Sequence, residues 1–114
     1  MLPDRAKSFS DAFDETLSLL GDVGRKGIYG YLQNKYGIGR EDIPTKFIDV
    51  SCILRTALGV VADVLLRHII ERFSTKLKLG IPKSMEIDDA IEIVQEILLG
   101  RVELRLAALA TMPD

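Results

Sequence analysis

The sequence predicts an all-α protein, a compact bundle or orthogonal array of four to five helices in a single domain spanning residues 1–114. Apolar residues recur at intervals of three and four along most of the chain, which is the spacing of one helix face. Hydrophobic residues make up 47% of the sequence and aromatic residues only 6%, so the core is expected to be mostly aliphatic. A chain of 114 residues has room for one such core.

Two helices are predicted in the first third of the chain. The first is expected to begin at Ser8 or Ser10, because serine is a favoured N-cap, and to end at Gly21. Its apolar face is formed by Phe9, Phe13, Leu17 and Leu20. Asp22 is expected to cap the second helix, and Gly37 is expected to terminate it.

The second predicted helix contains an unusual series of glycines, Gly24, Gly27 and Gly30. Each glycine inside a helix costs about 1 kcal/mol relative to alanine. Their three-residue spacing is that of a smooth stripe against which the backbone of another helix packs closely. The other interpretation is that the helix begins later, near Lys26. The sequence leaves both interpretations open.

Three more helical regions are predicted after Pro44, which is expected to lie at the turn into the third helix. That helix contains Cys52 among apolar residues, and Gly59 is expected to break or kink it before the fourth helix. The fourth helix is expected to end before Gly80, and the last one to open after Ser84. The residues expected near the centre of the core are Val61, Val64, Leu65, Ile69, Phe73, Ile91 and Val94.

The charges of the chain nearly balance, with 15 Lys and Arg against 17 Asp and Glu and a formal net charge of −2. This balance argues against a dominant electrostatic role such as coating nucleic acid. No segment reaches the roughly 18 consecutive apolar residues of a membrane-spanning helix. The first residues also lack the charged-then-apolar order of a signal peptide. We therefore expect a cytoplasmic protein that has no membrane contacts.

Cys52 and His68 are the only cysteine and the only histidine. Cys52 has apolar neighbours, which predicts that it is buried as a small hydrophobic residue. Two soft ligands are too few for a structural zinc site, and neither residue adjoins the glycine-rich turn typical of nucleophilic catalysis. The sequence therefore predicts no cofactor, no metal site and no catalytic residue. His68 is expected to pack within the fold or to face a partner.

A basic and aromatic segment, residues 25–40, supports an alternative function. Arg25, Lys26, Lys35 and Arg40 are interleaved there with the three tyrosines of the chain. Cations hold phosphates while aromatic rings stack on bases, so this pattern is typical of nucleic-acid-binding surfaces. The weak net charge and the lack of a recognisable helix-turn-helix spacing make nucleic acid the less favoured partner.

The C-terminal region carries more apolar residues than a small monomer readily covers. Leu98, Val102, Leu106 and Leu109 are expected to form an interface with a second copy or with another protein. The sequence therefore favours a homo-oligomer or a partner-binding protein.

Part of the chain resembles a known family. Residues 25–32 (RKGIYGYL), 35–38 (KYGI) and 41–44 (EDIP) are similar to the core signature of a small archaeal helical domain, the Nitrosopumilus output-domain type. The similarity covers residues 25–80 and departs from the pattern in the helix from 46 to 56, where more acidic residues are expected. The resemblance implies a helical output or interaction module, attached to signalling proteins or standing alone, without catalytic residues.

The favoured function is a non-enzymatic helical interaction or signalling-output module that acts through homodimerisation or partner-protein binding. One alternative is a nucleic-acid-binding helical protein that uses residues 25–40. A second alternative is a small-ligand binder or enzyme with a pocket near His68, which requires a concave cavity with convergent polar groups.

Overall fold

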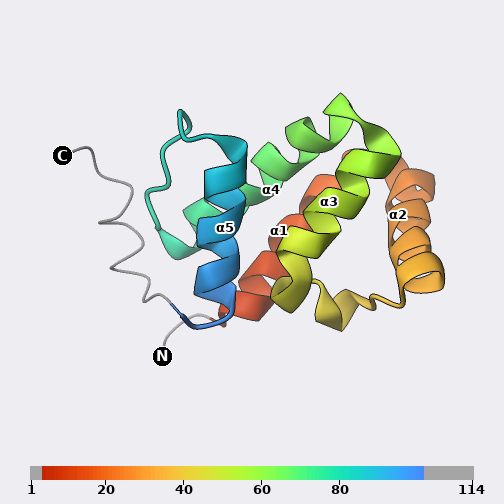
Figure 1. Ribbon diagram of the computed structural model, residues 1–114, viewed down its shortest axis with the longest axis horizontal. Coiled ribbons are helices and arrows are strands. Elements are labelled where there is room, and N and C mark those ends of the chain that lie inside the picture. Colours follow the sequence, from red (N-terminus) through yellow and green to blue (C-terminus); the bar gives the residue numbers. More distant parts are fainter. Residues whose placement is uncertain (1–3, 102–114) are drawn as a thin grey trace.

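The fold of the computed structural model, which describes residues 4–101, is entirely helical (Figure 1). Within these residues there are five α-helices, two short 3₁₀ turns and no strand. They are α1 (Arg5–Ser18), α2 (Gly21–Tyr36), η1 (Arg40–Asp42), η2 (Pro44–Lys46), α3 (Phe47–Leu58), α4 (Val60–Leu77) and α5 (Ile87–Leu98). The prediction of an all-α bundle of four to five helices is confirmed. None of these helices is long and apolar enough to cross a lipid bilayer.

Helix α4 is at the centre of the packing. It lies against α1, α3 and α5, and its contact with α1 is the most extensive between any two helices of residues 4–101. Helix α5 also packs on α3 and on η2. Helix α2 packs on α1 at the edge of the bundle (Figure 1), and Leu32 is its one buried residue. Most of α2 is therefore surface.

Phenylalanine side chains form the centre of the core. The ring centroid of Phe9 on α1 lies 4.7 Å from that of Phe47 and 5.4 Å from that of Phe73, both in edge-to-face geometry. All three side chains are fully buried. The aliphatic side chains packed around them include Leu17, Leu32, Leu54, Leu66, Ile69, Val94 and Ile97. The expected aliphatic core therefore has an aromatic centre, which joins α1 to α3 and α4.

Two of the residues predicted near the core centre face solvent, Val61 and Val64. The other five are buried as predicted: Leu65, Ile69, Phe73, Ile91 and Val94. The residues that α4 buries are Ala62, Leu65, Leu66, Ile69, Ile70, Phe73 and Leu77. The predicted and the observed face both have three- and four-residue spacing. The periodicity is therefore compatible with either, and the positions of α1, α3 and α5 decide which face is buried.

Helix α1 begins earlier than predicted. Its N-cap is Asp4, whose carboxylate accepts a hydrogen bond of 3.2 Å from the backbone N–H of Lys7. The predicted starts at Ser8 and Ser10 are wrong, because Asp4 already satisfies a free amide at the helix start. Both serines lie inside the helix.

Helix α2 runs without interruption from Gly21 to Tyr36. The predicted cap at Asp22 is wrong, since Asp22 lies in the first turn, where its charge suits the positive end of the helix dipole. A start near Lys26 is also wrong, because the helix already begins at Gly21. The predicted end at Gly37 is confirmed, with Gly37 in the left-handed conformation at φ 68°.

None of the three glycines inside α2 packs against another helix. A β-carbon placed on Gly27 would meet nothing within 4 Å, and one on Gly30 would meet only the side-chain amide of Asn34 at 4.0 Å. The atoms nearest to Gly24 belong to Leu20, just before the helix. The predicted close-packing stripe is therefore wrong for residues 4–101, because no other helix lies on that side of α2.

Substitution by alanine is expected to change the free energy of unfolding in opposite directions at a helical glycine and at a glycine with positive φ. Gly27 is helical and has free space around it, so Gly27→Ala should raise the free energy of unfolding by about 0.5–1 kcal/mol. Gly59, between α3 and α4, has φ 63° and ψ −138°, which residues with a β-carbon rarely adopt. Gly59→Ala should lower the free energy of unfolding by about 1–3 kcal/mol. Urea unfolding measures both, and a shift in the same direction for the two variants would contradict this assignment.

The buried polar side chains of residues 4–101 all have hydrogen-bond partners. Gln95 on α5 is the one that connects different elements. Its Oε1 accepts a hydrogen bond from the backbone N–H of Ile48, and its Nε2 donates to the carbonyl of Pro44, each at 2.9 Å. Gln95 therefore fixes α5 to the segment in which α3 begins.

Arg55 joins three helices at the surface. Its Nε donates to Oδ1 of Asp63 on α4 at 2.7 Å, and its Nη1 donates to Oδ1 of Asp88 on α5. These hydrogen bonds, first that to Asp88 and then that to Asp63, raise the pKa of Arg55. The carboxylate of Asp63 therefore has a structural role, because its hydrogen bond with Arg55 links α3 to α4.

Candidate functional site

The outer face at the start of α4 is the candidate functional site. Val60, Val61 and Val64 are 85%, 51% and 57% exposed, and His68 is exposed one turn further along the same face. We call these four residues the α4 surface. Helix α4 buries its other face against α1, α3 and α5, so helical geometry directs these side chains outward. The α4 surface is apolar where the helix begins and becomes polar at His68.

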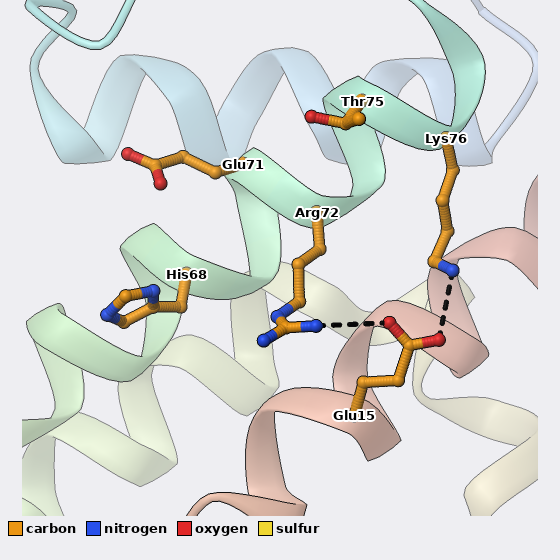
Figure 2. Close-up of a pocket in the computed structure, with 6 residues that line it drawn as sticks. All are labelled: Glu15, His68, Glu71, Arg72, Thr75 and Lys76. Atoms are coloured by element: carbon orange, nitrogen blue, oxygen red, sulfur yellow. Dashed lines mark hydrogen bonds and ion pairs between the residues drawn. The ribbon is translucent and has the colours of Figure 1, made fainter.

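Two open hollows lie beside Val64 and His68 of the α4 surface. One hollow of about 390 Å³ is lined by Glu15, His68, Glu71, Arg72, Thr75 and Lys76 (Figure 2). A second hollow of about 370 Å³ is lined by Asp63, Val64, Arg67, His68 and Glu71. Both hollows are open to solvent and both are lined by His68 and Glu71, and we call the two hollows together the groove.

Glu15 of α1 forms one wall of this groove (Figure 2). Its carboxylate accepts a hydrogen bond from Nη1 of Arg72 at 3.3 Å and another from Nζ of Lys76 at 2.9 Å. Both cations lie on α4, so the contact ties α1 to α4. Ion pairs with this degree of exposure contribute only about 0–1 kcal/mol each. Their main consequence is to orient the side chains along the groove.

His68 and Glu71 are two polar residues of the groove whose side chains have no partner within residues 4–101. Within residues 4–101 neither side chain forms a hydrogen bond or an ion pair, and both point away from Glu15 in Figure 2. No hydrogen-bonded group in this part of the chain orients His68, as a catalytic base requires. The same residues contain no cluster of three side chains able to hold a metal ion.

Cys52 is exposed, so the prediction that it is buried is wrong. The residues that α3 buries are Phe47, Val50, Ser51 and Leu54. Cys52 lies two positions from both Val50 and Leu54, which places it on the outer side of the helix. It lines a hollow between α3 and α5 that His68 does not line. The structure therefore does not bring Cys52 and His68 together.

Two of the basic residues predicted to contact nucleic acid, Arg25 and Arg40, meet at Asp14. Nη1 of Arg25 and Nη2 of Arg40 donate to Oδ1 of Asp14 at 3.0 and 3.1 Å. The hydroxyl of Tyr29 donates to the same oxygen at 2.9 Å, and the Arg40 guanidinium lies 4.2 Å from the centroid of the Tyr29 ring. The cluster joins α1, α2 and η1, so both cations hold the fold together.

Burial and hydrogen bonding act in opposite directions on Asp14. Partial burial raises the pKa of its carboxyl, but the hydrogen bonds from Tyr29 and Arg25 and the nearby positive charges outweigh this effect and leave the pKa below its ordinary value. Burial and then the hydrogen bond to Asp14 raise the pKa of Tyr29 to about 12. At neutral pH Asp14 is therefore ionised and Tyr29 is protonated.

The Asp14→Asn variant is expected to be less stable than the unmodified protein by about 1 kcal/mol at neutral pH, a modest value because the cluster is partly exposed. A carboxylate with a lowered pKa stabilises the fold above its unfolded pKa near 4, and this contribution is lost as the pH falls through the folded pKa. The difference in unfolding free energy between the two proteins should therefore shrink below about pH 4. Urea unfolding at neutral and acidic pH measures it, and a difference that grows in acid would contradict the assignment.

The other two predicted basic residues, Lys26 and Lys35, do not join the Asp14 cluster. Nζ of Lys35 lies 5.4 and 5.8 Å from the ring centroids of Tyr31 and Tyr36, near the end of α2. The two rings pack edge to face at 5.7 Å. Lys26 is exposed. The structure therefore divides the predicted basic surface between an arginine cluster held by a carboxylate and a separate lysine–tyrosine cluster.

Leu98 is the one residue of the predicted C-terminal interface that the structure describes. It ends α5, is half-buried and packs against the edge of the core. Val102, Leu106 and Leu109 lie outside the described residues. The C-terminal interface stays a prediction.

A second group of exposed apolar side chains, Leu19, Leu20 and Val23, lies where α1 turns into α2. The sequence pattern places Leu20 on the buried face of the first helix. This is wrong, because α1 ends at Ser18 and Leu20 lies in the turn. The adjacent leucines directly before Gly21 are the sequence signal for this exposure. Neighbouring helical residues do not share a face, so a helix that continued through both could not bury both.

Comparisons with known proteins do not assign this chain to a family: it matches no protein-family model, no curated protein and no solved structure. The resemblance to the Nitrosopumilus output-domain family stays a prediction. The function is therefore inferred from the geometry of the molecule.

Proposed function

We propose that this protein is a non-enzymatic helical interaction module that acts by homodimerisation or by binding a partner protein through the α4 surface. The observation that carries the proposal is the row of three exposed valines, Val60, Val61 and Val64, beside an open groove. Contiguous exposed apolar side chains rimmed by polar ones are typical of protein–protein contact sites.

Helix propensity gives no reason for these valines. Valine is a weaker helix former than alanine, lysine or glutamate, because its branched β-carbon restricts the side chain in a helix. Exposed valine also gains no burial in the isolated chain. A function that removes Val60, Val61 and Val64 from water supplies the missing reason.

The shape of the groove supports docking of a macromolecule. Small-molecule sites enclose most of the ligand surface in a concave pocket with convergent polar groups. The hollows beside His68 are open to solvent. Of the cations that line them, Arg72 and Lys76 are paired with Glu15, and Arg67 donates to the carbonyl of Met85. An extended surface of this kind fits a helix or a loop of another chain.

The predicted family agrees with this proposal, because the Nitrosopumilus output-domain resemblance implies an interaction or signalling-output module. A cytoplasmic location is part of the same proposal. Cys52 is the only cysteine and its thiol is exposed, which suits a reducing compartment.

Site-specific photocrosslinking tests the function. A photoreactive amino acid in place of Val64 is expected to form covalent adducts with protein in cells that express the full chain. The matched control carries the same amino acid in place of Asn34, an exposed residue of α2. It should give no such adducts.

Adducts at position 64 that contain polypeptide and are absent at position 34 support the proposal. Adducts only with nucleic acid, or none above the level of the control, would contradict it. Helicity measured by circular dichroism confirms that both labelled proteins fold.

A further inference from the structure

The exposed apolar side chains of residues 4–101 are concentrated at one end of the molecule. Among residues 4–101, nine large hydrophobic side chains are exposed, and six of them lie either in the turn between α1 and α2 or at the start of α2 or α4. We refer to the α1–α2 and α3–α4 connections as the two turns. Both turns lie at the upper right of Figure 1. We call these six residues the end patch: Leu19, Leu20, Val23, Val60, Val61 and Val64.

The end patch supplies close to the apolar area of a standard dimer contact. Its side chains are between 42% and 88% exposed. Fully burying one aliphatic side chain removes about 100 Å² from water, so the six supply on the order of 400 Å² of apolar surface. A standard interface removes about 800 Å² from each partner, of which somewhat more than half is apolar. The polar rim supplies the remainder.

The charges around the end patch are of both signs. Asp22 and Lys26 flank Val23 on α2, and Arg67 and Glu71 follow Val64 on α4. In a two-fold contact a patch faces a copy of itself, so a rim of one sign would repel its copy, whereas a mixed rim can pair. The rim of the end patch therefore permits self-association and does not select a strongly charged partner.

From this area and this rim we infer that the occupant of the end patch is a second copy of the same chain, related by a two-fold axis. The inference rests on the proposed interaction function and specifies its partner. Val60, Val61 and Val64 of each copy become buried against the apolar residues of the other end patch.

Light scattering after size-exclusion chromatography of the full 114-residue chain tests the inference. As its concentration is raised toward about 1 mM, the unmodified protein is expected to reach twice the mass of one chain. The double variant Val61→Asp, Val64→Asp should weaken the dimer at least about tenfold, because it places charges in the apolar contact. Val23→Asp, in the other half of the end patch, should weaken it as well.

The control is Leu99→Asp, which places the same charge on an exposed apolar residue outside the end patch. This variant should leave the dimer intact. Circular dichroism establishes that each variant keeps its helicity. If the double variant does not fold, Val23→Asp and the milder Val64→Thr, which keeps the shape of valine, carry the test.

Three results would overturn the second-copy inference. The first is a monomer at every concentration, and the second is a dimer that Leu99→Asp dissociates while the end-patch variants do not. The third is photocrosslinking at position 64 to a different protein alone. The second and third results leave the proposed interaction function standing, whereas a monomer that also forms no protein adduct at position 64 would remove both.

Discussion

The Phe9→Ala variant is expected to lose about 3–5 kcal/mol of unfolding free energy, which is a large part of the stability of a domain of this size. Phe9 is fully buried, and its ring contacts those of Phe47 and Phe73 in edge-to-face geometry. Removing the ring sacrifices the burial of its own surface and leaves a cavity among α1, α3 and α4. The rigid neighbouring rings limit how far that cavity can collapse.

Urea unfolding monitored by circular dichroism measures the effect. The control is Gln33→Ala, which shortens an exposed side chain of α2 outside the end patch and should change stability by less than about 0.5 kcal/mol. A Phe9→Ala variant as stable as this control would contradict the position of Phe9 at the centre of the core. A residual native dimer would add to the apparent stability, so both proteins are compared at the same low concentration.

Gln95→Leu is expected to cost about 2–4 kcal/mol although leucine is the more hydrophobic residue. The variant leaves the backbone N–H of Ile48 and the carbonyl of Pro44 without their side-chain partner. Each buried group that loses its hydrogen bond costs about 1–3 kcal/mol. The greater burial of apolar surface by leucine offsets only part of this loss.

Gln33→Leu is the matched control, because Gln33 is an exposed residue of α2. This substitution should stay within about 0.5 kcal/mol of the unmodified protein. If Gln95→Leu proved neutral or stabilising, Gln95 would not be the anchor between α5 and the start of α3. Hydrogen exchange at the amide of Ile48 gives an independent readout, since losing its acceptor should make that amide exchange faster.

The helices themselves could be predicted from the sequence, but the starts of the first two could not. The end of α2 at Gly37 follows from a glycine directly after an apolar pattern. The start of α1 does not follow from the sequence, because Asp4, Ser8 and Ser10 are all acceptable N-caps. Only the backbone path shows that Asp4 accepts the hydrogen bond from Lys7.

The candidate site was predicted only in part. The sequence predicts an exposed apolar surface, but at Leu98 and the residues beyond it. The structure describes another such surface at the start of α4, where the sequence predicts that Val61 and Val64 are buried. The predicted basic cluster was likewise divided, because Asp14 is distant in sequence from Arg40 and their pairing requires the folded arrangement of α1 and η1.

The amino-acid sequence sufficed to establish that this chain is helical and where most helices end, because spacing and capping are local properties of consecutive residues. The face that each helix buries was decided by its neighbours. Helix α4 has apolar residues around more than half of its circumference, so burial of Ala62 and Leu66 and exposure of Val61 and Val64 depend on where α1, α3 and α5 lie. The exposed valines on which the proposed function rests therefore become visible only in the folded protein, since exposure depends on contacts between residues distant in the chain.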